Sequence, residues 1–346
     1  MDYKGQPAGI RKYEPEGGDI SLLTVKEIFD LVRDDLSRVE EELTQQTGYA
    51  SEPVAEIATY LLGGGGKRLR PALLLLAAGY TGYQGAAAVR LGAVVELIHS
   101  ATLIHDDVID GADTRRGRPS ANSRWGNHRS VLAGDWLYMQ SFQMALEERN
   151  FKVLDILIDL TQNMVEGEVV QLSSLGRMDL GEREVVDLAA RKTACLFSGC
   201  ARLGGVLGSL SEAEEQSLAD YGRYAGLAFQ LVDDVLDFTA SPSQLGKPVL
   251  SDLKEGKVTL PLIYALQSDG AAGRRMVRTV LEEKGFHTVR PEEISALVRD
   301  SGALERTRLL ANEYAARAKA CLNGRANTEF GRALFAVPDF ILDREY

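Results

Sequence analysis

The most constraining feature of this chain is a pattern of aspartates that occurs twice, each time at the end of an apolar stretch with helical periodicity. The first copy is Asp106-Asp107-Val108-Ile109-Asp110, and the second is Asp233-Asp234-Val235-Leu236-Asp237. Residues three and four positions apart share one helix face, so each copy crowds three carboxylates together. Carboxylates near a helix C-terminus also oppose the helix dipole. Two helices with this costly pattern are predicted to face each other across a shared cation site.

The remainder of the chain predicts an all-α fold. Apolar residues recur at helical spacing, and sustained strand-like alternation is absent from the sequence. The expected helices are 25–43, 52–62, 72–80, 86–109, 129–149, 153–172, 182–210, 212–238, 260–267, 274–284, 291–300, 304–322 and 333–342. We therefore predict a flexible tail over residues 1–20, followed by one domain over residues 21–346. That domain is expected to be a single large helical bundle with a central apolar cavity.

Composition limits the partners and the compartment. The formal net charge is −11 and no basic run is present, which argues against a nucleic-acid partner. The first twenty residues lack the apolar run of a signal peptide, and no uninterrupted apolar stretch is long enough for a transmembrane segment. The three cysteines, Cys195, Cys200 and Cys321, form no CxxC pair. These features predict reduced thiols and a cytoplasmic protein.

The two aspartate clusters predict the identity of the cation. Six carboxylates around one cavity would repel one another, and hard divalent ions such as Mg²⁺ prefer oxygen ligands. Mg²⁺ also keeps positions open for water or phosphate oxygens. We expect two or three Mg²⁺ ions that hold an external diphosphate between the clusters.

Cations are placed where such an anion could be bound. Lys67, Arg68 and Arg70 follow Gly63-Gly64-Gly65-Gly66 and precede a helix, which favours an anion cradle over a Walker A loop because the Walker spacing is absent. His99 lies two turns before Asp106 on the same helix face. Arg115-Arg116 follow the first cluster and are suited to bidentate phosphate contacts. The alternative for each is a solvated or structural side chain.

A third group of polar residues accompanies the second cluster. Lys192-Thr193 lie in an apolar helix, where the lysine needs a partner, and Gln230 shares a face with Asp233. Lys247 and Lys257 flank the loop that follows the second cluster. No nucleophile with an adjacent base is evident in the sequence. Metal ligands, phosphate-binding cations and an apolar cavity together predict ionisation of an apolar diphosphate ester, shielded from water.

These motifs resemble those of the trans-isoprenyl diphosphate synthases, or polyprenyl synthetases, in the same order along nearly the whole chain after the tail. The resemblance extends through Gly246-Lys247-Pro248 and Asp252-Leu253-Lys254-Glu255-Gly256-Lys257. It implies the isoprenoid synthase fold, a homodimer, and repeated condensation of isopentenyl diphosphate onto an allylic diphosphate such as farnesyl diphosphate. The cation formed from the allylic substrate would add to the isopentenyl double bond, and a proton would then be lost.

The resemblance also implies a role for each matching residue. The principal Mg²⁺ ligands would be Asp106, Asp110 and Asp233, supported by Asp107, Asp234 and Asp237. Isopentenyl diphosphate would be held by Lys67, Arg70, His99 and Arg116. The allylic diphosphate would be held by Arg115, Lys192, Thr193, Gln230, Lys247 and Lys257, with Lys192 counted among the catalytic residues.

Product length is expected to depend on the helix that carries Asp106. Ala101 and Thr102 lie about one turn earlier, where short-chain relatives carry aromatic plugs. Small residues there predict an open tunnel and a long-chain, octaprenyl-type product of the kind used for quinone side chains. A deeper plug from Met139, Phe142 or Met164 would shorten the product. Farnesyl or geranylgeranyl diphosphate synthase, a terpene cyclase, and one half of a heteromeric synthase are the alternatives.

Overall fold

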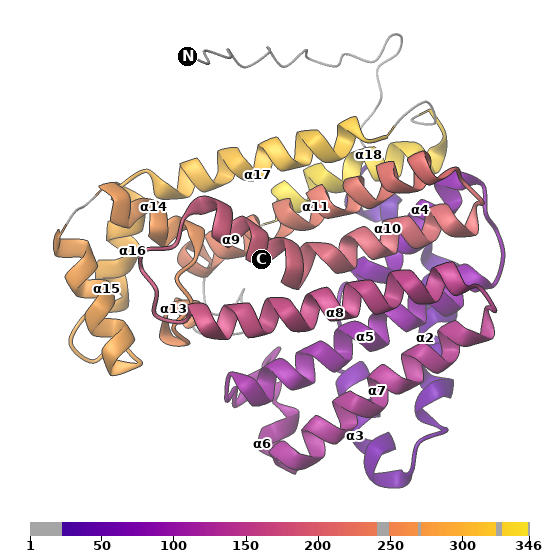
Figure 1. Ribbon diagram of the computed structural model, residues 1–346, viewed down its shortest axis with the longest axis horizontal. Coiled ribbons are helices and arrows are strands. Elements are labelled where there is room, and N and C mark those ends of the chain that lie inside the picture. Colours follow the sequence, from indigo (N-terminus) through magenta and orange to yellow (C-terminus); the bar gives the residue numbers. More distant parts are fainter. Residues whose placement is uncertain (1–22, 241–248, 269–270, 323–326, 345–346) are drawn as a thin grey trace, which may run out of the picture.

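The computed structural model describes residues 23–240, 249–268, 271–322 and 327–344, and these form helices almost throughout (Figure 1). The helices of the first half are α1 (Val25–Asp30), α2 (Arg33–Thr47), α3 (Glu52–Leu62), α4 (Leu69–Thr81), α5 (Ala87–Ile109), α6 (Ala121–Trp125), α7 (Asn127–Glu147) and α8 (Phe151–Ser174). Those of the second half are α9 (Glu182–Ala189), α10 (Cys195–Leu207), α11 (Glu212–Thr239), α13 (Ser251–Lys254), α14 (Leu260–Ser268), α15 (Ala271–Glu283), α16 (Pro291–Asp300), α17 (Ala303–Ala320) and α18 (Glu329–Leu342). The predicted all-α fold is confirmed.

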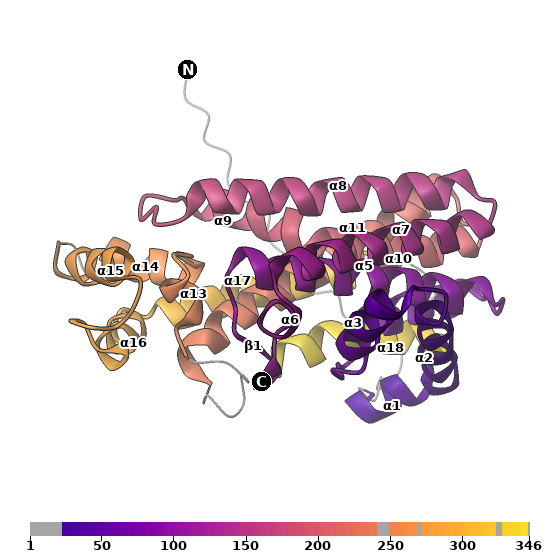
Figure 2. The same ribbon diagram turned by 90° about the horizontal axis from the view of Figure 1, so that it is seen from below.

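Helix α5 lies in the core of the bundle. It packs against α7, α4, α2 and α10, and Leu91, Leu97 and Ile98 on it are fully buried. Its apolar stretch is long enough to cross a membrane by length and composition, but 72% of that stretch is buried inside the fold. The surrounding long helices run side by side along the molecule, whereas α13, α14, α15 and α16 gather at one end (Figures 1 and 2). Helix α5 is thus a core helix that delivers its aspartates to the interior.

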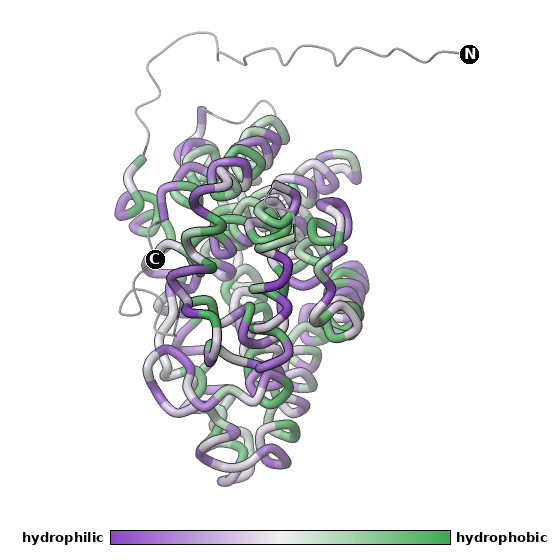
Figure 3. The backbone as a smooth tube through the Cα atoms, turned by 90° about the vertical axis from the view of Figure 1, so that its left-hand side faces the viewer, coloured by the Kyte–Doolittle hydropathy of each residue, from purple (hydrophilic) through white to green (hydrophobic). Residues whose placement is uncertain are grey.

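Helix α11 brings the second aspartate cluster to the same bundle. It begins at a capping box in which the Ser211 hydroxyl accepts from the backbone N–H of Glu214 and the Glu214 carboxylate accepts from the backbone N–H of Ser211. The helix packs against α10 and α17, and its small residues allow close approach. A Cβ on Gly226 would lie 2.6 Å from the Cα of Ala194. Purple and green alternate along the helices, as expected of elements with one polar and one apolar face (Figure 3).

Three local features differ from the sequence expectation. The first expected helix is interrupted at Leu31 and Val32, where Val32 leaves helical geometry with φ −121° and ψ 12°. Between the expected helices 86–109 and 129–149, where no element is predicted, the chain forms a short antiparallel ribbon, β1 (Thr114–Arg115) and β2 (Arg118–Pro119), followed by the helix α6. The helix expected over 182–210 contains one π-helical turn, η1 (Ala190–Ala194), between α9 and α10. The tail expected over residues 1–20 lies outside the described residues.

Candidate active site

The first aspartate cluster lies at the C-terminal end of α5, where each carboxylate has a cationic partner. The Lys192 Nζ atom lies 3.7 Å from the Asp106 Oδ2 atom, and Lys257 donates to Asp110 at 2.9 Å. Arg115 donates to Asp107 Oδ1 at 2.6 Å. Burial raises the pKa of Asp106, and the charge of Lys192 opposes that rise. The expected repulsion among these acids is therefore balanced by the protein's own cations.

The second cluster divides into one accessible acid and two buried ones. Asp233 is partly exposed and forms an ion pair with Arg344, with the Nη1 and Oδ1 atoms 3.0 Å apart. Asp234 is buried, and its carboxylate accepts from the Gln230 side chain at 2.9 Å. Asp237 is 1% exposed and accepts from the Ser251 hydroxyl at 3.3 Å. Burial raises the pKa of Asp234 well above its ordinary value. Only Asp233 of this cluster is therefore readily reached from the site.

The donor set fits Mg²⁺ in its chemistry. All candidate ligands are carboxylate oxygens, and Asp107 Oδ2 is buried without a hydrogen-bond partner in the described chain. Within the described ranges, no three His, Cys, Asp or Glu side chains are grouped closely enough to hold an ion by themselves. Mg²⁺ usually keeps several waters and is held by one or two carboxylates plus substrate phosphates, so it does not need a complete protein cage. The clusters thus fit a metal that binds together with a diphosphate.

The π-helical turn places Lys192 and Thr193 at the site. Gly167 on α8 permits the approach, because a Cβ there would lie 3.1 Å from the backbone nitrogen of Lys192. Lys192 reaches Asp106 from this turn and also pairs with Glu168 of α8, a half-buried carboxylate. Thr193 donates to Gln230 at 2.7 Å. The partner that an apolar helix requires for Lys192 is therefore present, and π-turns of this kind are frequent at functional sites.

A cavity of about 230 Å³ lies beside the start of α4. It is lined by four residues predicted for one diphosphate seat, Lys67, Arg70, His99 and Arg116, together with Arg344, Phe229 and Phe340. The Arg70 Nη1 atom lies 3.1 Å from the His99 Nε2 atom. Burial, followed by the charge of Arg70, lowers the pKa of His99 well below its ordinary value, so His99 is neutral and accepts from Arg70. Burial also lowers the pKa of Lys67, and the nearby Asp233 charge opposes that decrease.

Arg68 has a structural position in this cradle. It precedes α4 with φ 47°, and it donates to Glu96 Oε1 at 2.6 Å, to Glu40 Oε2 at 3.1 Å and to the Leu62 carbonyl at 2.9 Å. Glu96 is only 4% exposed. Arg68 also lines the cavity, but Glu40 and Glu96 already pair with its guanidinium, so it has less charge to offer an anion than the other cations there. The remaining cations, Lys67 and Arg70, point to the cavity.

Several residues at the site were not predicted from the sequence. Arg344 lines the same cavity as Lys67, Glu168 pairs with Lys192, and Glu96 anchors Arg68. Glu96, the only glutamate of α5, could have been noticed as a charge in an apolar helix, whereas Glu168, which shares α8 with Glu166, and Arg344 carry no such signal. Lys257, which follows the second cluster in the sequence, donates to Asp110 of the first cluster. Burial alone would lower the pKa of Lys257, but the charges of Glu255 and Asp110 raise it. Lys247 lies outside the described residues.

The expected product tunnel involves residues on three helices. Ala101 is fully buried within the apolar core, and the half-buried Thr102 satisfies its hydroxyl by donating to the His99 carbonyl at 2.7 Å. Met164 is buried and Phe142 packs against the same core. Met139, named with these two residues as a possible deeper plug, is 64% exposed and does not lie in the core of this chain. Cys195, Cys200 and Cys321 are free thiols, as predicted.

The chain is similar in sequence and in structure to known polyprenyl synthases. The model of the family described as polyprenyl synthetase matches residues 51–298. The chain is 38% identical over 324 residues to the octaprenyl diphosphate synthase of Escherichia coli (strain K12), an alignment that covers 93% of this chain and 100% of that protein. Two solved structures are also similar. A polyprenyl synthase from Caulobacter crescentus CB15, complexed with calcium and isoprenyl diphosphate, has a TM-score of 0.90 and 34% identity, covering 94% of this chain and 99% of that one. A decaprenyl diphosphate synthase from Rhodobacter capsulatus has a TM-score of 0.86 and 36% identity, covering 93% and 99%.

Proposed function

The chain belongs to the polyprenyl synthetase family, and from that premise we propose the residues with which it acts and the product that it makes. It is a long-chain trans-polyprenyl diphosphate synthase, in keeping with its octaprenyl and decaprenyl relatives. We propose an octaprenyl product for a quinone side chain, made in the cytoplasm from isopentenyl diphosphate and an allylic diphosphate such as farnesyl diphosphate.

One observation carries the assignment of the two substrate seats. The cavity of Lys67, Arg70, His99 and Arg116 is also lined by Arg344, whose Nη1 atom lies 3.0 Å from Oδ1 of Asp233 in the second cluster. A diphosphate in this cavity would therefore lie next to the acidic site, while a second diphosphate lies within it. A terpene cyclase uses one diphosphate and has no need of the first seat. We propose that this cavity binds isopentenyl diphosphate.

The second seat is proposed between the two clusters. Asp106, Asp110 and Asp233 would hold two or three Mg²⁺ ions, with Asp107, Asp234 and Asp237 supporting their positions. Mg²⁺, when bound, neutralises charge that develops on a departing diphosphate. Lys192, Thr193, Gln230, Lys257 and Arg115 surround the clusters and are proposed to orient the allylic diphosphate.

The chain's residues then determine the course of the reaction. Lys192 is held at Asp106 and Lys257 at Asp110, where their charges can stabilise the diphosphate as the allylic C–O bond breaks. Buried aliphatic walls exclude water from the resulting cation. The seat of Lys67 and Arg70 fixes isopentenyl diphosphate so that its double bond attacks the allylic carbon. The new adduct then loses a proton to the released diphosphate, as the family resemblance implies.

The exposed faces of α7 and α8 support a homodimer. Leu132, Met139 and Leu146 on α7 are exposed and recur every seventh residue, and Phe151, Ile158, Val165 and Leu172 on α8 repeat the same spacing. Figure 2 shows α8 along an outer edge of the molecule. Apolar stripes at this spacing are typical of helices that pack against other helices, and a monomer rarely exposes so many. We propose that a second copy of this chain covers them.

Incubation with isopentenyl diphosphate, farnesyl diphosphate and Mg²⁺, followed by chromatographic sizing of the products, tests the proposed function. We expect an octaprenyl product from the unaltered chain and loss of metal-dependent turnover in Asp106→Ala and Asp233→Ala. Products that stop at farnesyl or geranylgeranyl length would contradict the proposed length. Retained turnover in either variant would contradict the metal roles.

A further inference from the structure

The short ribbon after the first aspartate cluster is an electrostatically costly element. Its turn places Arg116 at φ 52° and Gly117 at φ 72°, both in the left-handed region typical of a two-residue hairpin turn. The register sets Arg115 directly opposite Arg118. Like charges directly opposite on two strands destabilise the pair. Each arginine therefore requires a partner outside the ribbon.

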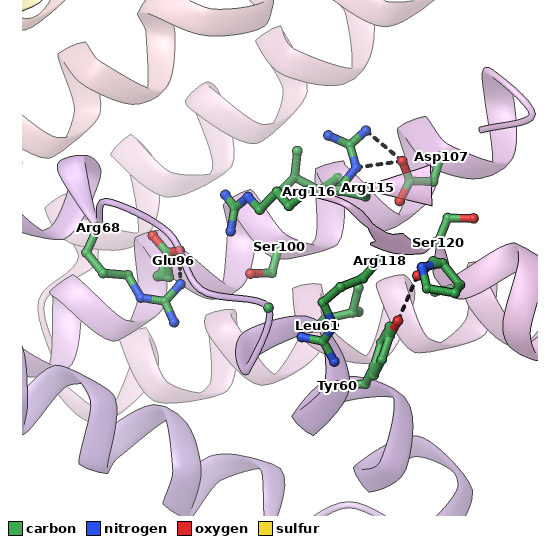
Figure 4. A pocket seen from close by; sticks show the side chains of 14 residues that line it. Tyr60, Leu61, Arg68, Glu96, Ser100, Asp107, Arg115, Arg116, Arg118 and Ser120 are labelled. Carbon is green, nitrogen blue, oxygen red and sulfur yellow. Dashed lines mark hydrogen bonds and ion pairs between the residues drawn. The ribbon is translucent and has the colours of Figure 1, made fainter. Parts of the chain in front are cut away.

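Arg118 finds its partners at the end of α3. Its guanidinium lies over the Tyr60 ring, 4.1 Å from the ring centroid, and its Nη1 atom donates to the Gly63 carbonyl at 3.2 Å. The Tyr60 hydroxyl donates to the Pro119 carbonyl at 2.8 Å. Figure 4 shows Tyr60 and Arg118 side by side, with Arg115 directed away toward Asp107. The two side chains thus form three contacts between β2 and the end of α3.

These contacts restrain the glycine loop that leads to Lys67. Four successive glycines have little intrinsic order, and Gly65 adopts φ 72°. Arg118 holds the first carbonyl of the loop, and Arg116 donates to the carbonyl of Gly65. The packing is close, because a Cβ on Gly66 would lie 2.9 Å from Arg116 Nη1. The ribbon therefore fixes the end of the glycine loop and, with it, the position of Lys67.

We propose that Arg118 and Tyr60 are positioning residues for the isopentenyl diphosphate seat. Neither lines the cavity of Lys67 and Arg116; both line the neighbouring pocket, which Arg116 also borders (Figure 4). They act by fastening the ribbon to the glycine loop, which keeps Lys67 and Arg116 at the spacing that one diphosphate requires. This inference rests on the proposed assignment of that cavity.

The same ribbon is connected to the other seat. Arg115 of β1 donates to Asp107, which is 1% exposed and lies in the first aspartate cluster. One small element is thus fixed to the metal cluster through β1 and to the glycine loop through β2. Arg118 and Tyr60 complete the second attachment, so their loss should affect the isopentenyl seat and leave the allylic seat in place.

Initial-rate kinetics on the full-length protein with each substrate varied separately tests this proposal. We expect Arg118→Ala to raise the KM for isopentenyl diphosphate about tenfold, with the KM for the allylic diphosphate unchanged. Tyr60→Phe, which removes one hydroxyl, should raise the same KM about threefold. Arg118→Lys should rescue part of the loss because it keeps a donor for Gly63. Arg124→Ala is the matched control and should change neither KM, since Arg124 also lies over the Tyr60 ring, at 4.8 Å, without bonding the glycine loop.

Lys67→Ala distinguishes failure of this proposal from failure of the seat assignment. A raised isopentenyl KM in Lys67→Ala together with an unchanged one in Arg118→Ala and Tyr60→Phe would overturn the positioning role alone. An unchanged KM in Lys67→Ala would overturn the seat assignment and the positioning role with it. Equal increases in both substrates' KM in Arg118→Ala and Tyr60→Phe would indicate general loss of structure and would also overturn the proposal.

Discussion

Replacement of Ala101 by phenylalanine tests whether the product runs along α5. Ala101 lies five positions before Asp106, which is about 7.5 Å along the helix axis at 1.5 Å per residue. It is fully buried. If the growing chain passes this position, the ring of Ala101→Phe should stop it at about farnesyl or geranylgeranyl length. The product distribution is read by chromatography after incubation with farnesyl diphosphate and isopentenyl diphosphate.

A stability measurement makes this prediction sharper. A phenylalanine forced into a closely packed core costs about 1–3 kcal/mol of folding free energy. Because Ala101 is fully buried, we expect Ala101→Phe both to shorten the product and to lose stability in this range, measured by chemical denaturation.

Ala318→Phe on α17 supplies the matched control. Ala318 is also fully buried, but it lies on a helix that carries none of the proposed site residues. It should lose about 1–3 kcal/mol and keep the product length. A destabilised Ala101→Phe that still makes the full-length product would show that Ala101 is ordinary core, and the tunnel reasoning would be refuted.

Two further predictions concern pH and assembly. His99 has a lowered pKa in the folded protein, so the unfolded chain binds a proton that the folded chain does not, and stability should fall as the pH drops below about 6.5. Denaturation curves of His99→Gln at neutral and mildly acidic pH should lack this part of the acid sensitivity; an identical pH dependence would contradict the assignment. Met139→Glu should convert a dimer to a monomer in light scattering, while Leu309→Glu, an exposed position on α17, should not; a Met139→Glu dimer would contradict the proposed interface.

The helical class and the location of the reactive groups were accessible from the sequence because both depend on short-range spacing. Apolar periodicity predicted most helices, and the repeated aspartate pattern predicted that α5 and α11 contribute to one site. The predicted helices differ from the observed ones where the sequence gives no sign of a break. The break at Leu31 and Val32 and the π-turn at Lys192 both interrupt sequences whose apolar spacing continues through them.

Partners far apart in the chain were not accessible in this way. In the sequence, Arg68 is one of three cations that follow the glycine loop. In the structure, Glu40 and Glu96 pair with it from two other helices. Arg344 carries no motif, and only the path of α18 brings it to Asp233. The charge that a side chain retains for a ligand depends on such neighbours, and no local pattern records them.

The two aspartate clusters show which properties of the site follow from the sequence and which follow from the tertiary structure. By itself the sequence determined that six carboxylates and a set of basic residues must share an apolar helical protein, because like charges at helical spacing require a compensating cation. Only the tertiary structure decided how they are used. It buries Asp107, Asp234 and Asp237, and it leaves Asp106, Asp110 and Asp233 facing lysine and arginine partners. Burial and long-range pairing set the availability of each charge, and both arise only when the helices pack.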